Sequence, residues 1–200
     1  MNHSVVHIVD DDEAIRDALC WLFQSRGVKT ADWPSARAFL ADYRPEMAGC
    51  LLLDVRMEDM SGLQLFDQLL ELSCPLPVIF LTGHGDVPLA VSALKKGALD
   101  FLEKPFNDNE LVDRVILALK QDAGRRASAA LGASQAARIA SLSERERQVM
   151  DLILAGKLNK LIADELSIAM RTVEVHRARI FDKMGVKSAV ELAQLLSGKM

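Results

Sequence analysis

Four short apolar runs in the first 110 residues are closely followed by charged or hydroxyl-bearing side chains. The runs cover residues 5–9, 50–53, 78–81 and 101–102, and the side chains behind them are Asp10 with Asp11 and Asp12, Asp54, Thr82 and Lys104. Apolar runs of this length, bounded by turn residues, are typical of buried strands. The pattern therefore predicts strands whose ends carry reactive groups.

Helix-like segments separate these runs. Apolar residues recur with helical spacing in segments 13–26, 35–40, 61–72, 87–96 and 107–120, and a weaker strand pattern covers 28–31. Five strands that alternate with five helices predict a doubly wound α/β domain, with a parallel sheet covered on both faces. Ligands of such sheets bind outside the carboxyl ends of the strands. We therefore expect the polar side chains at the four strand ends to lie close together.

Charge and composition divide the chain into three parts. Residues 1–120 carry 11 Lys/Arg and 19 Asp/Glu, whereas residues 121–140 carry 3 and 1, and residues 141–200 carry 10 and 8. The middle part holds eight alanines and few large apolar side chains, so we expect a partly helical linker between domains at 1–120 and 141–200. An acidic first domain and a mildly basic last domain suggest different partners.

Neither membrane insertion nor cysteine chemistry is indicated. No apolar run approaches the roughly 18–20 residues that a membrane span requires. The three cysteines are scattered and form no CxxC pair, so we interpret them as reduced core thiols. We therefore expect a cytoplasmic protein without a membrane partner.

The side chains at the strand ends suit phosphoryl transfer. Asp54 can act as an oxygen nucleophile, and Asp11 together with Asp54 forms an acidic pair that suits a hard cation such as Mg²⁺. Lys104 and Thr82 can offer a positive charge and a hydroxyl donor to phosphoryl oxygens. Each residue alone has an ordinary explanation, since an aspartate after a strand most often caps a helix or forms a turn. Four complementary strand ends together favour the phosphoryl site.

Five motifs within residues 4–120 resemble the receiver domain of two-component response regulators, whose sheet is flavodoxin-like. They are Val9-Asp10-Asp11-Asp12-Glu13, Leu53-Asp54-Val55-Arg56-Met57, Met60-Ser61-Gly62, Leu81-Thr82-Gly83 and Phe101-Leu102-Glu103-Lys104-Pro105-Phe106. The resemblance implies that Asp54 accepts a phosphoryl group from a sensor histidine kinase. It also implies Mg²⁺-dependent self-phosphorylation from a phosphodonor and slow autodephosphorylation, with no other enzymatic activity.

The same resemblance assigns the other residues of the site. It implies that Mg²⁺ or Mn²⁺ binds to Asp10, Asp11, Asp54 and the backbone carbonyl of Arg56. Lys104 would pair with the phosphoryl group, and Thr82 and Phe101 would couple phosphorylation to the pairing of two receivers. One position departs from the usual Met-Pro-x-Met-x-Gly pattern, because Glu58 occupies the place of the proline. The glutamate adds a negative charge and a less rigid backbone beside the site.

The last 60 residues contain only helical patterns. A capping-box sequence opens at Ser143, and short helices at 159–166 and 188–196 flank a longer one at 171–184, with a turn at 167–169. This is the plan of a four-helix domain with a helix-turn-helix, whose second helix enters the major groove. On a helical wheel, Val173, Ile180 and Met184 face inward, with His176 beside them. A net charge of only +2 leaves an interaction bundle as an alternative.

The motifs of this region resemble the LuxR/NarL-class DNA-binding domain over residues 141–196. They include Leu142-Ser143-Glu144-Arg145-Glu146, Asn159-Lys160 and Thr172-Val173-Glu174-Val175-His176. Together with the run at 82–86, they are similar to the FixJ-type subgroup. The predicted DNA contacts are Asn159, Lys160, Arg171, Thr172, Glu174, Val175, Arg177, Ala178, Arg179 and Lys183.

We therefore predict a transcriptional response regulator that phosphorylation activates. Its expected partners are a histidine kinase, a two-fold operator in double-stranded DNA, a second copy of the chain and RNA polymerase. Release of the DNA-binding domain from an inhibitory contact is an alternative route of activation. An aspartyl-phosphate hydrolase is disfavoured, because Arg56 occupies the place of its usual second aspartate. A receiver that serves only as a silent dimerisation module is the other alternative.

Overall fold

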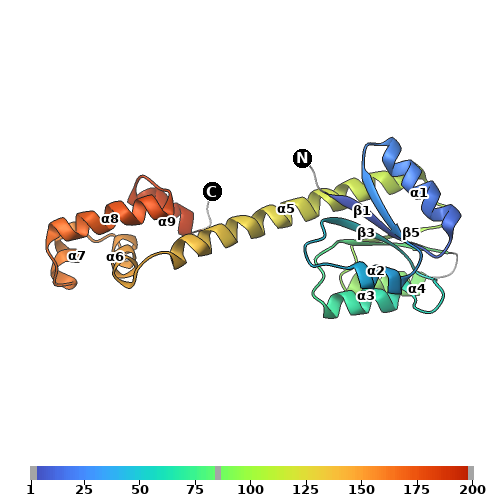
Figure 1. Cartoon of the computed structure of the whole chain (residues 1–200), viewed down its shortest axis with the longest axis horizontal. Coiled ribbons are helices and arrows are strands. Elements are labelled where there is room, and N and C mark those ends of the chain that lie inside the picture. The colour runs from blue at the N-terminus through green and yellow to red at the C-terminus, as the bar shows by residue number, and fades with distance from the viewer. Residues whose placement is uncertain (1–3, 84–86, 198–200) are drawn as a thin grey trace. The chain divides into compact units, whose positions relative to one another are not determined.

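The chain divides into two compact units, Met1–Ala127 and Ser128–Met200. The computed structural model describes residues 4–83 and 87–197. Within these residues, the first unit contains a five-stranded parallel sheet with the strand order β2-β1-β3-β4-β5 (Figure 1). The strands are β1 (Val5–Val9), β2 (Lys29–Trp33), β3 (Gly49–Asp54), β4 (Val78–Thr82) and β5 (Asp100–Glu103). The predicted α/β class is confirmed.

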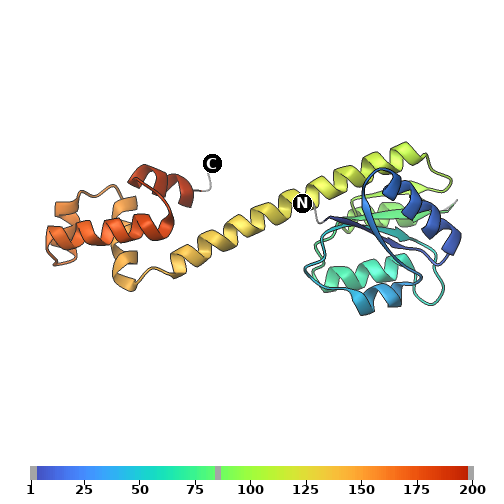
Figure 2. The same cartoon turned by 45° about the horizontal axis from the view of Figure 1, so that its top comes forward.

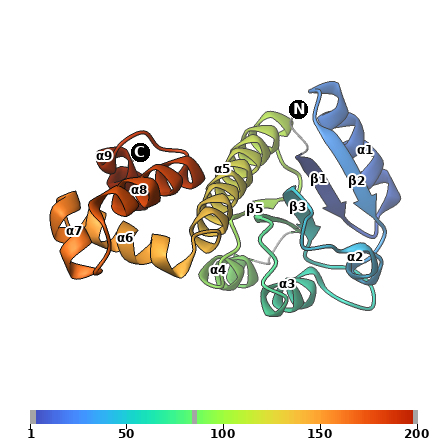
Figure 3. The same cartoon turned by 60° about the vertical axis from the view of Figure 1, so that its left-hand side comes forward.

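Helices cover both faces of this sheet (Figures 2 and 3). They are α1 (Glu13–Ser25), α2 (Ala36–Asp42), α3 (Gly62–Glu71), α4 (Val87–Lys95) and α5 (Asp108–Ala140). Phe23 of α1 and Leu111 of α5 pack in one core cluster, whereas Phe39 of α2 and Leu65 of α3 pack in the other. Successive residues of β3 alternate between the two clusters, because side chains of a strand point to opposite faces. Asp54 is the last residue of β3 and lies at the carboxyl edge.

Helix α5 is longer than the sequence pattern predicts. The pattern predicts a helix over 107–120 and a partly helical linker over 121–140, whereas α5 continues without a break to Ala140. Alanine, arginine and glutamine have high helix propensity, and the cost of Gly124 and Gly132, about 1 kcal/mol each, does not end the helix. The loss of amphipathic spacing after Lys120 therefore marks the end of sheet packing rather than the end of the helix.

The amino edge of the sheet carries a buried carboxylate on α5. Asp122 is 1% exposed and accepts hydrogen bonds from the backbone N–H of Gly49 (2.9 Å) and from Arg125 (2.6 Å). Arg126 donates to the carbonyls of Glu46 and Met47, at 3.1 and 3.2 Å. These bonds fix α5 to the start of β3, at the opposite edge from Asp54.

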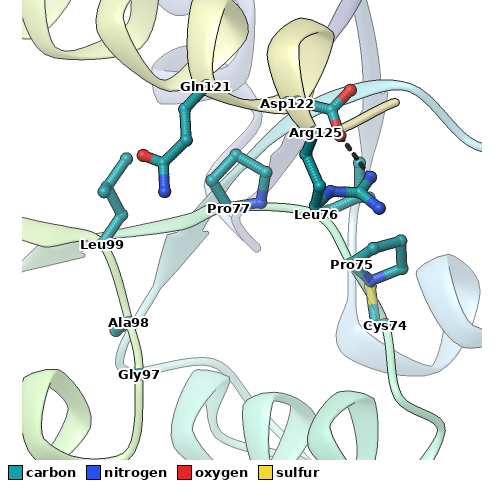
Figure 4. A pocket seen from close by; sticks show the side chains of 10 residues that line it. All are labelled: Cys74, Pro75, Leu76, Pro77, Gly97, Ala98, Leu99, Gln121, Asp122 and Arg125. Atoms are coloured by element: carbon teal, nitrogen blue, oxygen red, sulfur yellow. Dashed lines mark hydrogen bonds and ion pairs between the residues drawn. The ribbon is translucent and has the colours of Figure 1, made fainter. Parts of the chain in front are cut away.

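A pocket of about 300 Å³ opens beside this carboxylate (Figure 4). It is formed by the loop before β4, the turn before β5 and α5, through Cys74, Pro75, Leu76, Pro77, Gly97, Ala98, Leu99, Gln121, Asp122 and Arg125. Arg125 pairs with Asp122 inside it. Because its loop residues precede β4 and β5, the pocket lies at the amino edge of the sheet, away from the predicted phosphoryl site.

The second unit is helical. Within its described residues it contains the end of α5 and helices α6 (Glu144–Leu154), α7 (Asn159–Glu165), α8 (Met170–Met184) and α9 (Ala189–Leu196), around a core that includes Val149, Ile162, Val173, Ile180 and Leu192. The predicted capping box is present, since Ser143 and Glu146 each accept a hydrogen bond from the other's backbone N–H. Among the described residues, no helix has both the length and the hydropathy needed to cross a membrane.

A partly buried ion pair joins α6 to α8. Glu146 is 3% exposed, and its carboxylate accepts hydrogen bonds from Lys183 (2.6 Å) and from the backbone N–H of Ser143 (2.8 Å). These bonds to the charged form lower the pKa of Glu146 to about 2. Lys183 also donates to the carbonyl of Ser141 at 3.0 Å, so the pair holds the start of α6 against the end of α8.

We expect Glu146→Gln to destabilise the second unit at pH 7 by about 2 kcal/mol, because it weakens charge-assisted hydrogen bonds. The pKa of Glu146 is lower in the folded chain than in the unfolded chain. Its contribution to stability is therefore complete above the unfolded-state pKa, and it is lost as the pH falls toward the folded-state pKa. The difference between the wild-type chain and the variant should therefore shrink between about pH 4.5 and pH 2. Hydrogen exchange of α6 and α8 peptides would measure it. Glu144→Gln, on the exposed first turn of α6, is the control, and an equal effect of both variants would contradict the prediction.

Candidate functional site

Three predicted residues meet at the carboxyl edge of the sheet. The Lys104 ammonium donates to Asp10 Oδ2 at 2.8 Å and to Asp54 Oδ1 at 2.6 Å. Asp10 and Asp54 are 1% and 6% exposed, and both belong to or follow central strands. Parallel β1, β3 and β4 bring their carboxyl ends together, while the turn after β5 supplies the lysine. The structure thus places Asp10, Asp54 and Lys104 in one ion-paired group.

Burial and charge act in opposite directions on these groups. Burial raises the pKa of the Asp54 carboxyl above its ordinary value, and the hydrogen bond from Lys104 offsets part of this rise. Burial by itself lowers the pKa of Lys104, but its hydrogen bonds to Asp10 and Asp54 raise it above the ordinary value. Lys104 is therefore charged near neutral pH. The ammonium of Lys104 favours the anionic form of Asp54, and this form is suited to receive an electrophilic phosphorus.

The other carboxylates of the acidic cluster have separate partners. Asp12 caps α1 by accepting from the backbone N–H of Ala14 at 2.9 Å, so the ordinary explanation holds for this residue. Asp11 is exposed, and its Oδ2 accepts the backbone N–H of Glu58 at 3.1 Å. Asp54 Oδ2 accepts the backbone N–H of Arg56 at 2.6 Å. The loop after β3 therefore contacts both Asp54 and Asp11.

The predicted switch residues lie on the neighbouring strands. Thr82 is 2% exposed at the end of β4, and its hydroxyl donates to the carbonyl of Gly83 at 3.2 Å. Phe101 of β5 is partly buried and packs against the core cluster that contains Phe80. The rest of the FixJ-type run, residues 84–86, lies outside the described residues.

The donors at this edge fit a hard cation in their chemistry. No group of three or more His, Cys, Asp or Glu side chains within residues 4–83 and 87–197 is gathered closely enough to hold a metal ion as it stands. The carboxyl edge nevertheless supplies three carboxylates, of Asp10, Asp11 and Asp54, and the loop backbone at Arg56. Oxygen ligands are those that Mg²⁺ and Mn²⁺ prefer. The ammonium of Lys104 offsets one of the three carboxylate charges, so two remain for a cation to balance.

Helix α8 presents most of the predicted DNA contacts. Val173, Ile180 and Met184 are fully buried, as the helical wheel predicts. The exposed residues of the predicted set on this helix are Arg171, Thr172, Glu174, Val175, Ala178, Arg179 and Lys183. Arg177 is half-buried, with its guanidinium 5.3 Å from the centre of the Phe181 ring. His176 is half-buried on the inner side.

A groove at the start of the preceding helix, α7, carries basic side chains. Asn159 and Lys160 form the first turn of α7 and line a groove of about 530 Å³ with Lys157 and Arg177. The basic side chains around this groove, which include Arg177 of α8, suit phosphate contacts. Lys183 differs from the other predicted contacts. Its ammonium is engaged by Glu146 and by the Ser141 carbonyl, so its geometry supports a structural role.

Comparison with known proteins assigns the chain to a class. Residues 6–116 match the family described as response regulator receiver domain, and residues 140–196 match the luxR family of bacterial regulatory proteins. The chain belongs to the two-component response regulators, as a transcriptional regulator of the FixJ type. These domains imply a kinase and DNA as partners. The predicted helix-turn-helix domain is therefore confirmed over the interaction bundle.

Individual relatives match nearly the whole chain. The C4-dicarboxylate transport transcriptional regulatory protein DctR of Rhodobacter capsulatus is 55% identical over 192 residues, covering 95% of this chain and 98% of that protein. The transcriptional regulatory protein FixJ of Bradyrhizobium diazoefficiens is 46% identical over 191 residues, covering 95% and 93%. The solved structure of the response regulator StyR has a TM-score of 0.93 and 41% identity, covering 98% of this chain and 99% of that one.

Proposed function

We propose that Asp54 is the phosphoacceptor of this regulator, with a cognate histidine kinase as donor. The observation that carries this proposal is the position of Asp54 at the carboxyl end of β3, 2.6 Å from the Lys104 ammonium. A carboxylate oxygen of Asp54 attacks phosphorus as the bond to the donor's imidazole nitrogen breaks, and the electron pair of that bond leaves with the nitrogen. Lys104 stabilises the charge on the transferred group.

A divalent cation, Mg²⁺ or Mn²⁺, is part of this proposal. Asp10, Asp11, Asp54 and the Arg56 carbonyl would hold it, and it supplies positive charge against the phosphoryl oxygens. Lys104 can exchange its bond to Asp54 for a bond to a phosphoryl oxygen while it keeps its bond to Asp10. The Thr82 hydroxyl can likewise leave the Gly83 carbonyl for the phosphoryl group.

We infer that the chain carries a signal rather than turning over a substrate. Arg56, two residues after the acceptor, is a cationic side chain without a general-base function. Hydrolysis of the aspartyl phosphate is therefore slow, and beyond it we expect only Mg²⁺-dependent self-phosphorylation from a phosphodonor.

Pairing of phosphorylated receivers would use the edge formed by α4, β5 and α5. Leu89, Val91 and Leu94 of α4 are 44%, 42% and 37% exposed, and Leu117 of α5 is 62% exposed. β5 is an edge strand between the two helices, so its side offers an unpaired surface. Thr82 on β4 lies between Asp54 on β3 and this edge, and Phe101 belongs to the edge strand β5, so both support transmission from the phosphoryl group.

In the DNA-bound form, the exposed residues of α8 would read base edges, and those at the start of α7 would contact phosphates. Two such units on a receiver homodimer suit a two-fold operator. The exposed side chains of Leu158 and Leu161, at 74% and 54%, give the second unit an apolar surface that supports contact with RNA polymerase. A DNA-binding regulator of this kind would act in the cytoplasm.

Sedimentation velocity tests the proposed activation. We expect acetyl phosphate with Mg²⁺ to convert a monomer into a dimer, because phosphorylation favours pairing through α4, β5 and α5. Leu94→Glu should take up phosphate normally and remain monomeric, since a charge in an apolar interface opposes association. A fully phosphorylated wild-type chain that stays monomeric at every concentration would refute the pairing, while leaving the acceptor assignment to the labelling experiment.

A further inference from the structure

We propose that the backbone amide of Glu58 is a positioning group for the metal ligand Asp11. The proposal rests on the proposed metal site. The Glu58 N–H donates to Asp11 Oδ2 at 3.1 Å and joins the loop after β3 to the loop after β1. The contact with Asp11 is therefore made by the backbone of Glu58 and not by its exposed side chain.

The loop that carries this amide is held at both ends. The Arg56 N–H donates to Asp54 Oδ2, and the Gly62 N–H donates to the Val55 carbonyl at 3.1 Å. Between them the chain turns sharply, with Asp59 at a φ of 63° and the Met60 N–H 2.7 Å from the Glu58 carbonyl. A loop fixed in this way gives its amide a defined direction toward Asp11.

The bond has a chemical consequence for cation binding. Asp11 is exposed, so its carboxylate would otherwise lose rotational freedom when a cation binds. A carboxylate has about four lone-pair sites, so one amide bond leaves room for a cation. Hydrogen bonds of this kind orient ligands, and their loss typically weakens metal binding about 10–100-fold. The Glu58 amide therefore strengthens Mg²⁺ binding.

Proline at this position would remove the bond, because proline has no backbone N–H. The usual motif, Met-Pro-x-Met-x-Gly, contains that proline, so the bond is a consequence of the departure in this chain. The residue thus has two separable effects. Its carboxylate adds an exposed charge, whereas its amide orients Asp11.

Two variants of the full chain separate these effects. Glu58→Ala removes the charge and keeps the N–H, and Glu58→Pro removes both. Calorimetric titration with MgCl₂ would measure the dissociation constant of each unphosphorylated chain, and thermal unfolding without Mg²⁺ would verify that each is folded. We expect Glu58→Ala to lie within about twofold of wild type, because exposed charges are screened. Glu58→Pro should bind about tenfold more weakly than Glu58→Ala, at the low end of the range because both groups are exposed.

Equal or tighter binding by Glu58→Pro than by Glu58→Ala would overturn the proposal. Should Glu58→Pro fail to fold, the amide itself can be tested by proton–nitrogen NMR of wild type and Asp11→Ala. We expect the Glu58 amide to exchange more slowly in wild type, and equal exchange would also overturn the proposal. A wild-type chain that binds no Mg²⁺ would instead remove the metal site, and with it the role of the amide in cation binding.

Discussion

A chain with asparagine at position 54 is expected to take up no phosphoryl group from acetyl phosphate at any Mg²⁺ concentration. The neutral amide of asparagine lacks the anionic oxygen that attacks phosphorus, and its hydrogen bond to Lys104 is weaker than that of a carboxylate. The substitution keeps the shape of a side chain that is only 6% exposed, so the receiver should remain folded. Intact-protein mass spectrometry would count the phosphoryl groups on each chain.

Asp59→Asn is the matched control for Asp54→Asn. Asp59 lies in the same loop, is exposed and has a φ of 63°, a conformation that asparagine tolerates. We expect this control to be labelled to the same extent as the wild-type chain. Labelling of Asp54→Asn at the wild-type level would move the acceptor to Asp10 or Asp11 and would refute the assignment of Asp54.

Replacement of Gly49 by alanine is expected to unfold the receiver. Gly49 begins β3 at a φ of 130°, and an added Cβ would lie 1.8 Å from the Val5 carbonyl oxygen. Val5 belongs to the neighbouring strand β1, so relief would require the two central strands to separate. Both the backbone conformation and the contact are unfavourable. We expect a loss of more than about 4 kcal/mol in the free energy of unfolding, a large part of the stability of a domain of this size.

Gly27→Ala separates backbone strain from the steric contact. Gly27 has a φ of 71°, but an added Cβ would meet nothing within 4 Å. We therefore expect Gly27→Ala to lower the free energy of unfolding by about 1–2 kcal/mol, the energy needed to hold an alanine in the left-handed conformation. Urea unfolding followed by the fluorescence of Trp33, which is buried in the receiver core, would compare the variants. Similar losses for the two substitutions would contradict the argument about Val5.

The candidate phosphoryl site could be predicted from the sequence because parallel strands end at one edge of a sheet. Asp10, Asp54 and Lys104 are far apart along the chain, but each follows an apolar run that predicts a strand. Parallel strands place their carboxyl ends at one edge, so the order of runs was enough to predict the meeting of these three residues. The helical wheel of α8 correctly predicted its buried residues for a similar reason. The period of about 3.6 residues per turn alone decides which side chains face the core.

Other features could not be predicted because they depend on contacts between distant segments. The pairing of Lys183 with Glu146 needs the packing of α6 against α8, whereas the sequence placed Lys183 among the predicted DNA contacts. Burial of Asp122 against Gly49 depends on the path of α5 past the sheet. The bond from the Glu58 amide to Asp11 joins two loops that are 47 residues apart.

The sequence by itself determined the class of fold, the order of its elements and the residues at the strand ends, because periodicity and strand polarity are local properties. Only the tertiary structure decided which partner each charge has. Lys104 donates to both Asp10 and Asp54, the backbone N–H of Glu58 donates to Asp11, and Lys183 forms an ion pair with Glu146. Hydrogen bonds act over about 3 Å and depend on direction. Such precision arises only when the packed core fixes the backbones that carry the side chains.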